Sequence, residues 1–488
     1  RLFIFLFLLI SSLVNAKDQP NIVIVFTDDQ GYADVGCFGA EGFETPNLDK
    51  MASEGIKFTD FYVAQAVCGA SRAALLTGCY PNRIGMLGAP GPKSRHGINP
   101  DEILIPEMLK QKGYATGMYG KWHLGHGHFK YTPKARGFKD FFGPYHGGAD
   151  HWEHIAWLGG GPHRDAIRRS QHVGEDSNGN GAMYYQGRAK TTTLDHKHGR
   201  YERDGRYIHE HITQDNMTHS SDAFTNQAIQ MIWEHNVEKD GQLFLYLPYT
   251  APHWPTQFYQ QDADFNSHIP GQKRREFAGM ITHLDRCIAK IVDVLKRKHM
   301  WSNTLFIGYG DNGGDITTGA SNWPYRGTKT TPWEGGTRAA SFVHSPNPAV
   351  IPIERRGTES YALAHVTDWY PTLLSLAGVR SEDLAVPGKP LDGVNMWEGL
   401  VNGKYDPGNG QRIEMLYELD DVVHPMGEAK FLTRATNAFV NVTTLRIGDW
   451  KLIDGIDLIV HIFHPEKRKF YELEKMWSEL IPKEKVII

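Results

Sequence analysis

Short apolar runs alternate with helical patterns along the chain, and this alternation predicts a mainly parallel α/β sheet. The first run, NIVIVFTDD (Asn21–Asp29), is a continuous apolar strand that ends in two acids. The segment TPNLDKMASEG then predicts a helix, with Thr45 as N-cap, Pro46 in the first turn and Gly55 as the stop. The expected core is therefore a large mixed, mainly parallel sheet flanked by helices.

Two further segments have helical spacing. Residues 221–240 carry Phe224, Ala228 and Ile232 on one face, and a second helix is predicted from Phe277 onward. The apolar stripe of this second helix consists of Ile281, Leu284, Ile288, Ile291 and Leu295. We interpret that stripe as core and assign it no other role.

A polar segment rich in His and Gly, roughly residues 143–220, has weak periodicity, and no regular structure is predicted for it. Its basic residues form a candidate cationic rim at the mouth of a binding pocket, although a solvated loop accounts for them at least as well. These residues are His146, His151, His154, His163, Arg164, Arg168 and Arg169.

The domain organisation follows from both ends of the chain. The sheet-and-helix pattern weakens after residues 377–379, and GKPLDG (Gly388–Gly393) marks a predicted seam. We expect a large domain over residues 17–385 and a smaller C-terminal α+β domain over residues 386–488. Residues 1–16, RLFIFLFLLISSLVNA, combine an N-terminal Arg, an apolar run and a small-x-small ending, which is typical of a secretory signal peptide.

The signal peptide predicts export, so the mature protein is expected to be secreted, lysosomal or periplasmic. A membrane anchor is the alternative for residues 1–16, but their apolar run is shorter than the ~20 residues of a membrane span. Later stretches do not approach that length either, and no membrane association is expected after cleavage. Two sequons, at Asn216 and Asn441, are candidate glycosylation sites.

Charge and cysteine content exclude two classes of protein. The formal net charge of −4 provides no basic field for nucleic acid. The cysteines are too few for a disulfide-framed scaffold, although one bridge is compatible with them. They are Cys37, Cys68, Cys79 and Cys287.

Polar groups follow four of the predicted strands. Because ligands bind outside the carboxyl ends of the strands in open α/β sheets, we expect one sheet to bring these groups to a single rim. Each cluster alone has an ordinary structural interpretation, as a helix cap, a tight turn or a structural histidine, but their recurrence at four strand ends favours a site. The residues are Asp28 and Asp29, Lys121 and His123, His253, and Asp311 and Asn312.

The residue types indicate the chemistry. Carboxylate and amide oxygens suit a hard divalent cation, Ca²⁺ or Mg²⁺, whereas zinc would require His or Cys ligands. Basic side chains would bind an anionic substrate group, and histidines can transfer protons near neutral pH. The candidate metal ligands are Asp28, Asp29, Asp311 and Asn312, the candidate cations are Arg72, Lys121 and Lys329, and the candidate proton-transfer groups are His123 and His253.

Cys68 stands just before a predicted helix in QAVCGASRAALLTGCYP. Backbone N–H groups and the helix dipole favour an anion there, and a free thiolate at that position would be reactive. A thiolate is nevertheless a soft ligand and a poor partner for an oxygen-lined site. If Cys68 faces the cation, the chemistry requires an oxygen where the sequence encodes sulfur.

The sequence around Cys68, CGASRAALLTG, resembles the C-x-[PA]-S-R-x-x-x-[LI]-T-G signature of the type I, formylglycine-dependent sulfatases. PNIVIVFTDDQGYADVGCFG, TPNLDKMASEGIKFTDFY, GYATGMYGKWHLG, GDNGG and GTKTTPWEGGTR resemble other blocks of that family, in the same order. The resemblance covers about residues 19–453. NWPYRGTKTTPWEGGTRAASFVHSP and HVTDWYPTLLSLAGV are most similar to the arylsulfatase B-type N-acetylgalactosamine-4-sulfatases.

The resemblance implies an alkaline phosphatase-like fold and a sulfuric ester hydrolase acting on a sulfated carbohydrate or an aryl sulfate. It also implies that a maturation enzyme oxidises Cys68 to formylglycine, whose hydrate attacks sulfur with one hydroxyl and later releases sulfate through the other. One Ca²⁺, or less favourably Mg²⁺, would be bound by residue 68 and the four oxygen ligands. The implied roles are formylglycine contact for Arg72, sulfate binding for Lys121 and Lys329, deprotonation of the second hydroxyl for His123, and contact with sulfate or the leaving group for His253.

The chain departs from the family pattern at three places. Ala70 stands where Pro is commonest, Cys79 replaces an Arg that commonly follows T-G, and the tail after GDWKLI loses the usual pattern. Three alternatives stay open: a related-fold phosphohydrolase, a cysteine hydrolase that uses Cys68 directly, and a non-catalytic protein that binds sulfated glycans through Lys and Arg. The residues place no His–Asn pair for the cysteine hydrolase.

Overall fold

The computed structural model describes residues 19–86, 88–91, 94–147, 151, 201–203, 206–208, 219–384, 390–403, 412, 414–419, 442–447, 450–455 and 458–463. The predicted signal peptide, most of the His- and Gly-rich segment and both sequon asparagines lie outside the described residues. Among the described helices, none is long and apolar enough to cross a bilayer.

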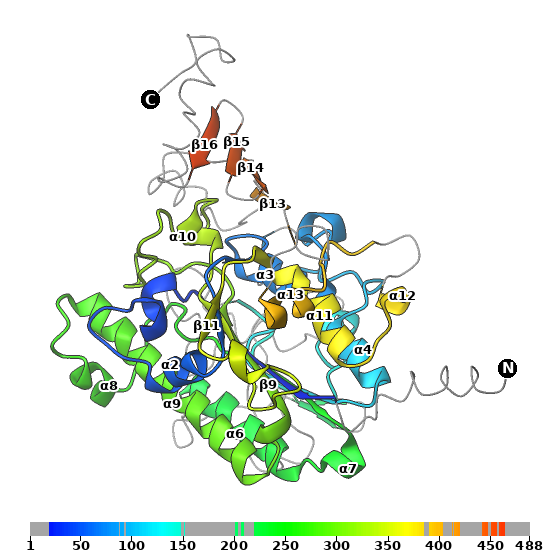
Figure 1. The fold of residues 1–488 in the computed structure, drawn as a ribbon. Coiled ribbons are helices and arrows are strands. Elements are labelled where there is room, and N and C mark those ends of the chain that lie inside the picture. The colour runs from blue at the N-terminus through cyan, green and yellow to red at the C-terminus, as the bar shows by residue number, and fades with distance from the viewer. Residues whose placement is uncertain are drawn as a thin grey trace.

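An eight-stranded sheet forms the centre of the fold (Figure 1). In spatial order its strands are β11 (Thr358–Ser360), β2 (Ile56–Phe58), β10 (Ser341–His344), β9 (Thr304–Gly310), β1 (Asn21–Thr27), β8 (Leu243–Pro248), β4 (Ala115–Tyr119) and β5 (Asp140–Phe142). Neighbouring strands are parallel except where β10 pairs with β2 and with β9. The prediction of a mixed, mainly parallel sheet is confirmed.

Helices cover both faces of this sheet, and the alternation of side chains along β1 shows how. Ile22, Ile24 and Phe26 pack into one apolar layer, whereas Val23 and Val25 pack into the other. The layer on the Ile22 side is closed by α3 (Cys68–Thr77), α4 (Ile105–Gln111) and α11 (Trp369–Leu376). The opposite layer is closed by α2 (Pro46–Ser53), α6 (Ser220–Glu234) and α9 (Gln272–Arg297).

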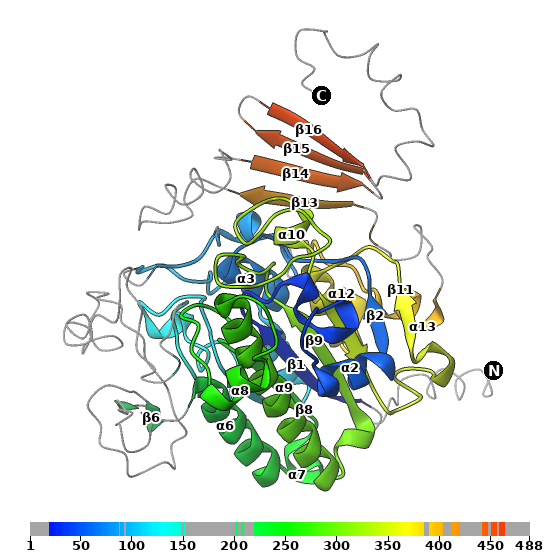
Figure 2. The same ribbon diagram turned by 90° about the vertical axis from the view of Figure 1, so that its left-hand side faces the viewer.

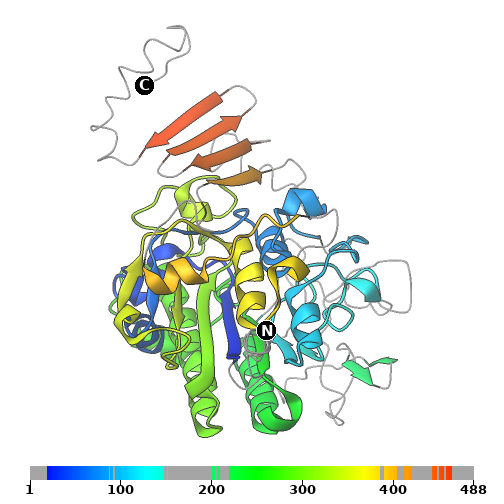
Figure 3. The ribbon, with the colours of Figure 1, turned by 45° about the vertical axis from the view of Figure 1, so that its right-hand side comes forward.

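The two helical layers can be followed in the rotated views. Figure 2 shows α6 and α9 in front of the central strands, and Figure 3 brings the side of α4 and α11 forward. Burial on both faces explains why β1 is apolar throughout instead of alternating with polar residues. This part of the fold follows from the sequence pattern.

Helix boundaries differ from the prediction at two places. Residues 221–240 form two helices, α6 and α7 (Val237–Asp240), because His235 is extended and the Asn236 side chain caps the N–H groups of Glu238 and Lys239. Helix α9 begins at Gln272, earlier than the Phe277 that starts the apolar stripe. Its first turns carry polar residues that a hydrophobic pattern cannot detect.

The remaining elements are short or C-terminal. The described part contains β3 (Phe61–Tyr62), β6 (Tyr201–Arg203), β7 (Arg206–Ile208), α8 (Gln260–Phe265), α10 (Glu334–Thr337), β12 (Ala364–His365), α12 (Ser381–Leu384) and α13 (Trp397–Asn402). A separate antiparallel sheet lies beyond α10 in Figure 2 and consists of β13 (Glu414–Leu419), β14 (Val442–Ile447), β15 (Trp450–Gly455) and β16 (Leu458–Phe463). Arg446 of this sheet reaches Glu334 of α10 at 3.5 Å.

Candidate active site

Four neighbouring parallel strands, β9, β1, β8 and β4, end at the same edge of the large sheet. The chain places the candidate site residues just beyond these ends, so residues far apart in sequence meet there. Asp28 follows β1 and Lys121 follows β4, and their side chains form an ion pair of 2.6 Å. The expected rim at the carboxyl ends of the strands therefore exists as a geometric feature.

The floor of this rim is a buried network of ion pairs. Arg72, on α3, donates to Asp311 Oδ2 from Nε at 3.1 Å and from Nη2 at 2.8 Å. Its remaining terminal nitrogen, Nη1, donates to the carbonyl oxygen of Lys121 at 2.8 Å. The side chains of Arg72, Lys121, Asp28 and Asp311 are fully buried. A charge-assisted network of this kind fixes the carboxylates in position.

A second layer of the site lies nearer to solvent and centres on Asp29. Lys329 Nζ lies 2.7 Å from Asp29 Oδ2, and His253 Nε2 lies 3.5 Å from the same oxygen. Asn312 Nδ2 donates to Asp29 Oδ1 at 2.8 Å. The side chains of Lys329 and His253 are 18% and 17% exposed, so this layer forms the open edge of the site.

Cys68 lies between the two layers at the start of α3. The sequence pattern predicted a helix that begins after Cys68, but the helix begins at Cys68 itself. Its Sγ lies 3.3 Å from His123 Nδ1, and carboxylate oxygens of Asp28 and Asp311 lie within 4.8 Å of it and of each other. Gly69 lets the backbone of Gly88 and Ala89 approach the start of α3, because a Cβ there would lie 2.8 Å from the Cα of Ala89.

The backbone is strained at the same place. The described residues include four non-glycine positions with positive φ, and three of them belong to or adjoin the site: Asp29 (62°), His123 (57°) and Thr330 (67°). The left-handed region is unfavourable for residues that carry a Cβ, so the surrounding structure must hold them there. Asp29 N–H donates to Asp311 Oδ1 at 3.1 Å, which is one such restraint.

Burial dominates the protonation of the central groups. It raises the pKa of Asp311 to about 7, and the neighbouring Asp28 carboxylate adds to that rise. Burial also raises the pKa of the Cys68 thiol, despite Lys121 and Lys329 nearby. The pKa of His123 is well below its usual value, because of burial first and then the charge of Lys121.

These shifts bear on the cysteine hydrolase alternative. The sequence placed no His–Asn pair for such an enzyme, and the structure brings His123 Nδ1 to 3.3 Å from the Cys68 sulfur. Yet burial favours the neutral thiol and the neutral imidazole, and a reactive thiolate–imidazolium pair would require the opposite. Although the two groups lie within contact distance, their burial does not favour Cys68 as a thiolate nucleophile.

The donor set fits a hard divalent cation. Among the described residues, Asp28 Oδ1 and Asn312 Oδ1 are buried without a hydrogen-bond partner, and Arg72 Nη2 lies 3.6 Å from Asp28 Oδ1, beyond hydrogen-bond distance. Buried oxygens of this kind are costly unless a donor or an ion satisfies them. Oxygen ligands around one point suit Ca²⁺ or Mg²⁺, and the single sulfur of Cys68 is the donor that does not fit.

Two residues of the predicted cationic rim are described, and both are buried. The ring of His146 lies 5.3 Å from that of His123, measured between centroids. His151 Nε2 lies 3.0 Å from the carbonyl oxygen of His253. These two histidines support the candidate catalytic histidines instead of lining an exposed rim, and the other five lie outside the described residues.

Sequence reasoning missed the parts of the site that backbone atoms and small residues supply. The carbonyl oxygen of Pro90 lies 3.2 Å from His123 Nε2, and Gly147 packs against the His123 ring. Neither position carries a chemical group that a motif could identify. Cys79, the departure from the family pattern, is buried with its Sγ 3.6 Å from the carbonyl oxygen of Thr77. All four cysteines are free, so the compatible disulfide does not form.

The sheet, its two helical layers and the oxygen-rich centre at the strand ends define the class: an alkaline phosphatase-like α/β protein with a centre suited to a hard cation. A family model described as Sulfatase matches residues 20–379, and the chain therefore belongs to the sulfatase family. This confirms the resemblance found in the sequence. A second model, described as Ribosomal silencing factor during starvation, matches residues 415–486, a short part of the chain from which we draw no function.

Named relatives are found both by comparison of sequences and by comparison of structures. The chain is 34% identical to arylsulfatase J of Mus musculus over 443 residues, which cover 90% of this chain and 64% of that protein. It is 29% identical to N-acetylgalactosamine-6-sulfatase of Homo sapiens over 412 residues, or 80% of this chain and 67% of that protein. The solved structure of Ps i-CgsB in complex with k-i-k-neocarrahexaose matches with a TM-score of 0.72 and 27% identity, over 95% of this chain and 92% of that one. The chain thus spans slightly less than two thirds of arylsulfatase J.

Proposed function

We propose that this protein hydrolyses a sulfate ester of a carbohydrate, using a formylglycine made from Cys68 and one divalent cation. The observation that carries the proposal is the pair of buried, unsatisfied oxygens, Asp28 Oδ1 and Asn312 Oδ1, at a site where Cys68 Sγ lies within 4.8 Å of Asp28 and Asp311 carboxylate oxygens. Such a site suits a hard cation and an oxygen at position 68, and a formylglycine would supply that oxygen.

The cation would be held by the four oxygen donors and residue 68, with Ca²⁺ favoured over Mg²⁺ because the site offers many protein oxygens. The formylglycine would supply a nucleophilic oxygen, and the bound cation would supply positive charge for the ester oxygens. Three carboxylates and three fixed cations already balance each other in the site. A divalent cation would therefore leave net positive charge, which suits an anionic ester. The carboxylates are Asp28, Asp29 and Asp311, and the cations are Arg72, Lys121 and Lys329.

His123 is placed to accept a proton from the group at position 68. Its Nε2 faces the carbonyl oxygen of Pro90, which can only accept a hydrogen bond, so Nε2 carries the proton of the neutral ring. The other nitrogen, Nδ1, then presents its lone pair to residue 68 at 3.3 Å. A neutral imidazole aimed at the reacting group is the arrangement that general base catalysis requires.

Lys121 and Lys329 would bind the sulfate group from two sides, because one lies on the buried floor and the other at the open edge. His253 shares that edge and would contact the sulfate or the leaving group there. Arg72 would hold residue 68 and Asp311 in fixed relation, since it donates two hydrogen bonds to Asp311 from the same helix turn that carries Cys68.

The substrate class rests on the open edge and on the relatives. Trp254 follows His253 directly and is 43% exposed, so its ring offers an apolar face beside the site. N-acetylgalactosamine-6-sulfatase names a sugar, and Ps i-CgsB was solved with a neocarrahexaose. We therefore favour a sulfated glycan over a simple aryl sulfate.

The remaining features of the proposal concern processing and organisation. A formylglycine at position 68 implies a maturation enzyme as a transient partner, and the predicted signal peptide implies export to a secreted, lysosomal or periplasmic location. Residues 17–385 would form the catalytic domain and residues 386–488 the smaller C-terminal domain. The sequons at Asn216 and Asn441 would carry glycans in a eukaryotic host.

Mass spectrometry of the tryptic peptide over residues 58–72 tests the modification. In protein produced together with a maturation enzyme, we expect an aldehyde in place of the Cys68 thiol, and Cys68→Ala is expected to lose sulfate ester hydrolysis. A panel of defined sulfated oligosaccharides, with matched phosphate esters, identifies the substrate. A peptide that carries only thiol, in protein that still binds sulfated glycans, would support the non-catalytic alternative, and preferential phosphate ester hydrolysis would support the phosphohydrolase.

Gly147→Ala tests the position of His123. A Cβ at residue 147 would lie 2.3 Å from Cε1 of the His123 ring, so the ring must move. Because misplacing a catalytic group by about 1 Å costs about 10²-fold in rate, we expect kcat to fall by about that factor. Gly279→Ala on α9 is the control, since a Cβ there would approach no atom more closely than the backbone N of Ala263 on α8, at 3.2 Å. Unchanged kcat in Gly147→Ala would count against His123 as the base.

A further inference from the structure

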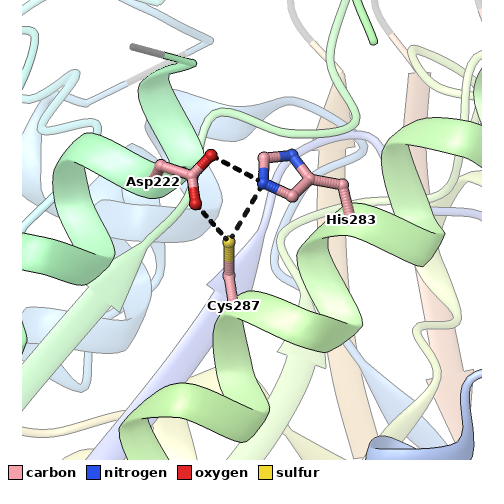
Figure 4. Close-up of side chains that lie close together, drawn as sticks. All are labelled: Asp222, His283 and Cys287. Atoms are coloured by element: carbon pink, nitrogen blue, oxygen red, sulfur yellow. Dashed lines mark hydrogen bonds and ion pairs between the residues drawn. The ribbon is translucent and has the colours of Figure 1, made fainter. Parts of the chain in front are cut away.

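A second cluster of metal-ligating side chains lies between α6 and α9 (Figure 4). Asp222 comes from the first turn of α6, and His283 and Cys287 lie one helical turn apart on α9. Residues four apart share one face of a helix, so both α9 side chains point toward Asp222. The apolar stripe of α9 was predicted to be core, and the sequence pattern indicated no role for His283 or Cys287.

The three side chains lie close together, and each oxygen of Asp222 contacts one of the other two. His283 Nε2 lies 2.9 Å from Asp222 Oδ2 and 3.4 Å from Cys287 Sγ. Cys287 Sγ lies 3.7 Å from Asp222 Oδ1. Tetrahedral zinc, with bonds of about 2.0–2.3 Å, separates its ligand atoms by about 3.3–3.6 Å. Small side-chain adjustments would therefore bring one Asp222 oxygen, His283 Nε2 and Cys287 Sγ to the spacing of three zinc ligands.

The donor chemistry differs from that of the candidate active site. One nitrogen, one sulfur and one carboxylate oxygen suit zinc, whereas the oxygen donors at the strand ends suit calcium or magnesium. His283 and Cys287 are 3% and 0% exposed, and the Asp222 side chain is 14% exposed. The ligands are thus buried on rigid helices, and the Asp222 side gives an ion a path to solvent.

Neighbouring groups hold the carboxylate in place, as outer partners do in zinc sites. Tyr259 Oη donates to Asp222 Oδ2 at 2.9 Å, and Lys290 Nζ lies 3.0 Å from Asp222 Oδ1. The His283 ring packs edge-on against His219, with 4.8 Å between centroids. These contacts fix the orientation of Asp222 and His283 before any ion arrives.

We propose that Asp222, His283 and Cys287 form a zinc site that ties α6 to α9, with the fourth position open to water. Zn²⁺ replaces the thiol proton of Cys287, so binding releases a proton and strengthens as pH rises. The site is independent of the proposed sulfatase activity.

Co²⁺ provides the direct test, because its thiolate complexes absorb in the near ultraviolet. The Cys68→Ala protein with excess Ca²⁺ serves as background, so that the candidate active site contributes no thiolate. Addition of Co²⁺ is expected to produce the thiolate absorption band, and Zn²⁺ is expected to abolish the band by displacement. Cys287→Ser should remove the band, whereas Cys37→Ser, at a half-buried cysteine elsewhere, should keep it.

Thermal unfolding in the presence of Zn²⁺ gives a second readout. Zn²⁺ should raise the Tm of the background protein, and His283→Gln and Asp222→Asn should weaken Zn²⁺ binding at least about tenfold and lose the rise in Tm. These two variants keep Cys287, so they test the site even if Cys287→Ser fails to fold. The proposal is overturned if the background protein shows no cobalt band, or if the band persists in Cys287→Ser.

Discussion

Alanine at Lys121 or His123 is expected to lower kcat/KM for a sulfate ester by at least about 10³-fold while the protein stays folded. Lys121 is the fully buried cation on the floor of the site, and His123 holds the lone pair that faces residue 68. Each replacement removes charge stabilisation or proton transfer that acts on the reacting group. The measurement is steady-state kinetics on a defined sulfated oligosaccharide, with circular dichroism to establish folding.

A matched lysine separates this effect from the loss of an ion pair. Lys57 pairs with Glu359 at 2.7 Å, about as closely as Lys121 pairs with Asp28, but it lies on β2, remote from the strand ends that carry the site. Lys57→Ala should therefore retain nearly full activity. Retention of activity in both Lys121→Ala and His123→Ala would refute the site assignment.

Arg72→Met is expected to destabilise the cation-free protein by about 3–5 kcal/mol, the cost of leaving buried charge without its partner. Arg72 is fully buried, donates to Asp311 and to the carbonyl oxygen of Lys121, and stacks over the ring of Phe26 at 5.2 Å. Without Arg72, less positive charge offsets the repulsion between the carboxylates of Asp28 and Asp311. Urea unfolding with and without Ca²⁺ measures the effect.

The response to Ca²⁺ makes the test specific. With Arg72 gone, the carboxylates attract a cation more strongly, so Ca²⁺ should stabilise the variant by more than it stabilises the wild type. Arg380→Ala is the control, because Arg380 pairs with Asp383 at the exposed surface, where solvent and salt screen the pair and its contribution to stability is small. Equal stability of Arg72→Met and the wild type would show that the ion-pair network is not a determinant of folding.

The hydrophobic pattern predicted the fold well where burial is continuous. Strand β1 is apolar because helices cover both its faces, and such a strand can be read directly from the sequence. The break between α6 and α7 was not predicted. Asn236 caps α7 soon after α6 ends, and the spacing of apolar residues along the chain does not change there. The residues of the predicted cationic rim were chosen only because their segment is rich in basic residues, and His146 and His151 proved to be buried.

The proposed zinc site could not be predicted from the sequence alone. His283 and Cys287 can be paired from their spacing once α9 is known, but Asp222 lies 65 residues before Cys287 on another helix. The spacing alone also fits a core histidine beside a core cysteine. Only the packing of α6 on α9 adds the carboxylate that makes metal chemistry a specific hypothesis.

By itself, the sequence determined the order of strands and helices, the oxygen and basic groups at four strand ends, and the family motif around Cys68. These features are local, because each depends on residues adjacent along the chain. The tertiary structure decided which groups meet: Lys121 with Asp28, 93 residues away, Lys329 with Asp29, 300 residues away, and His123 with Cys68. Partner choice, burial and the resulting pKa shifts depend on distances set by sheet order and helix packing, which no short segment of the chain encodes.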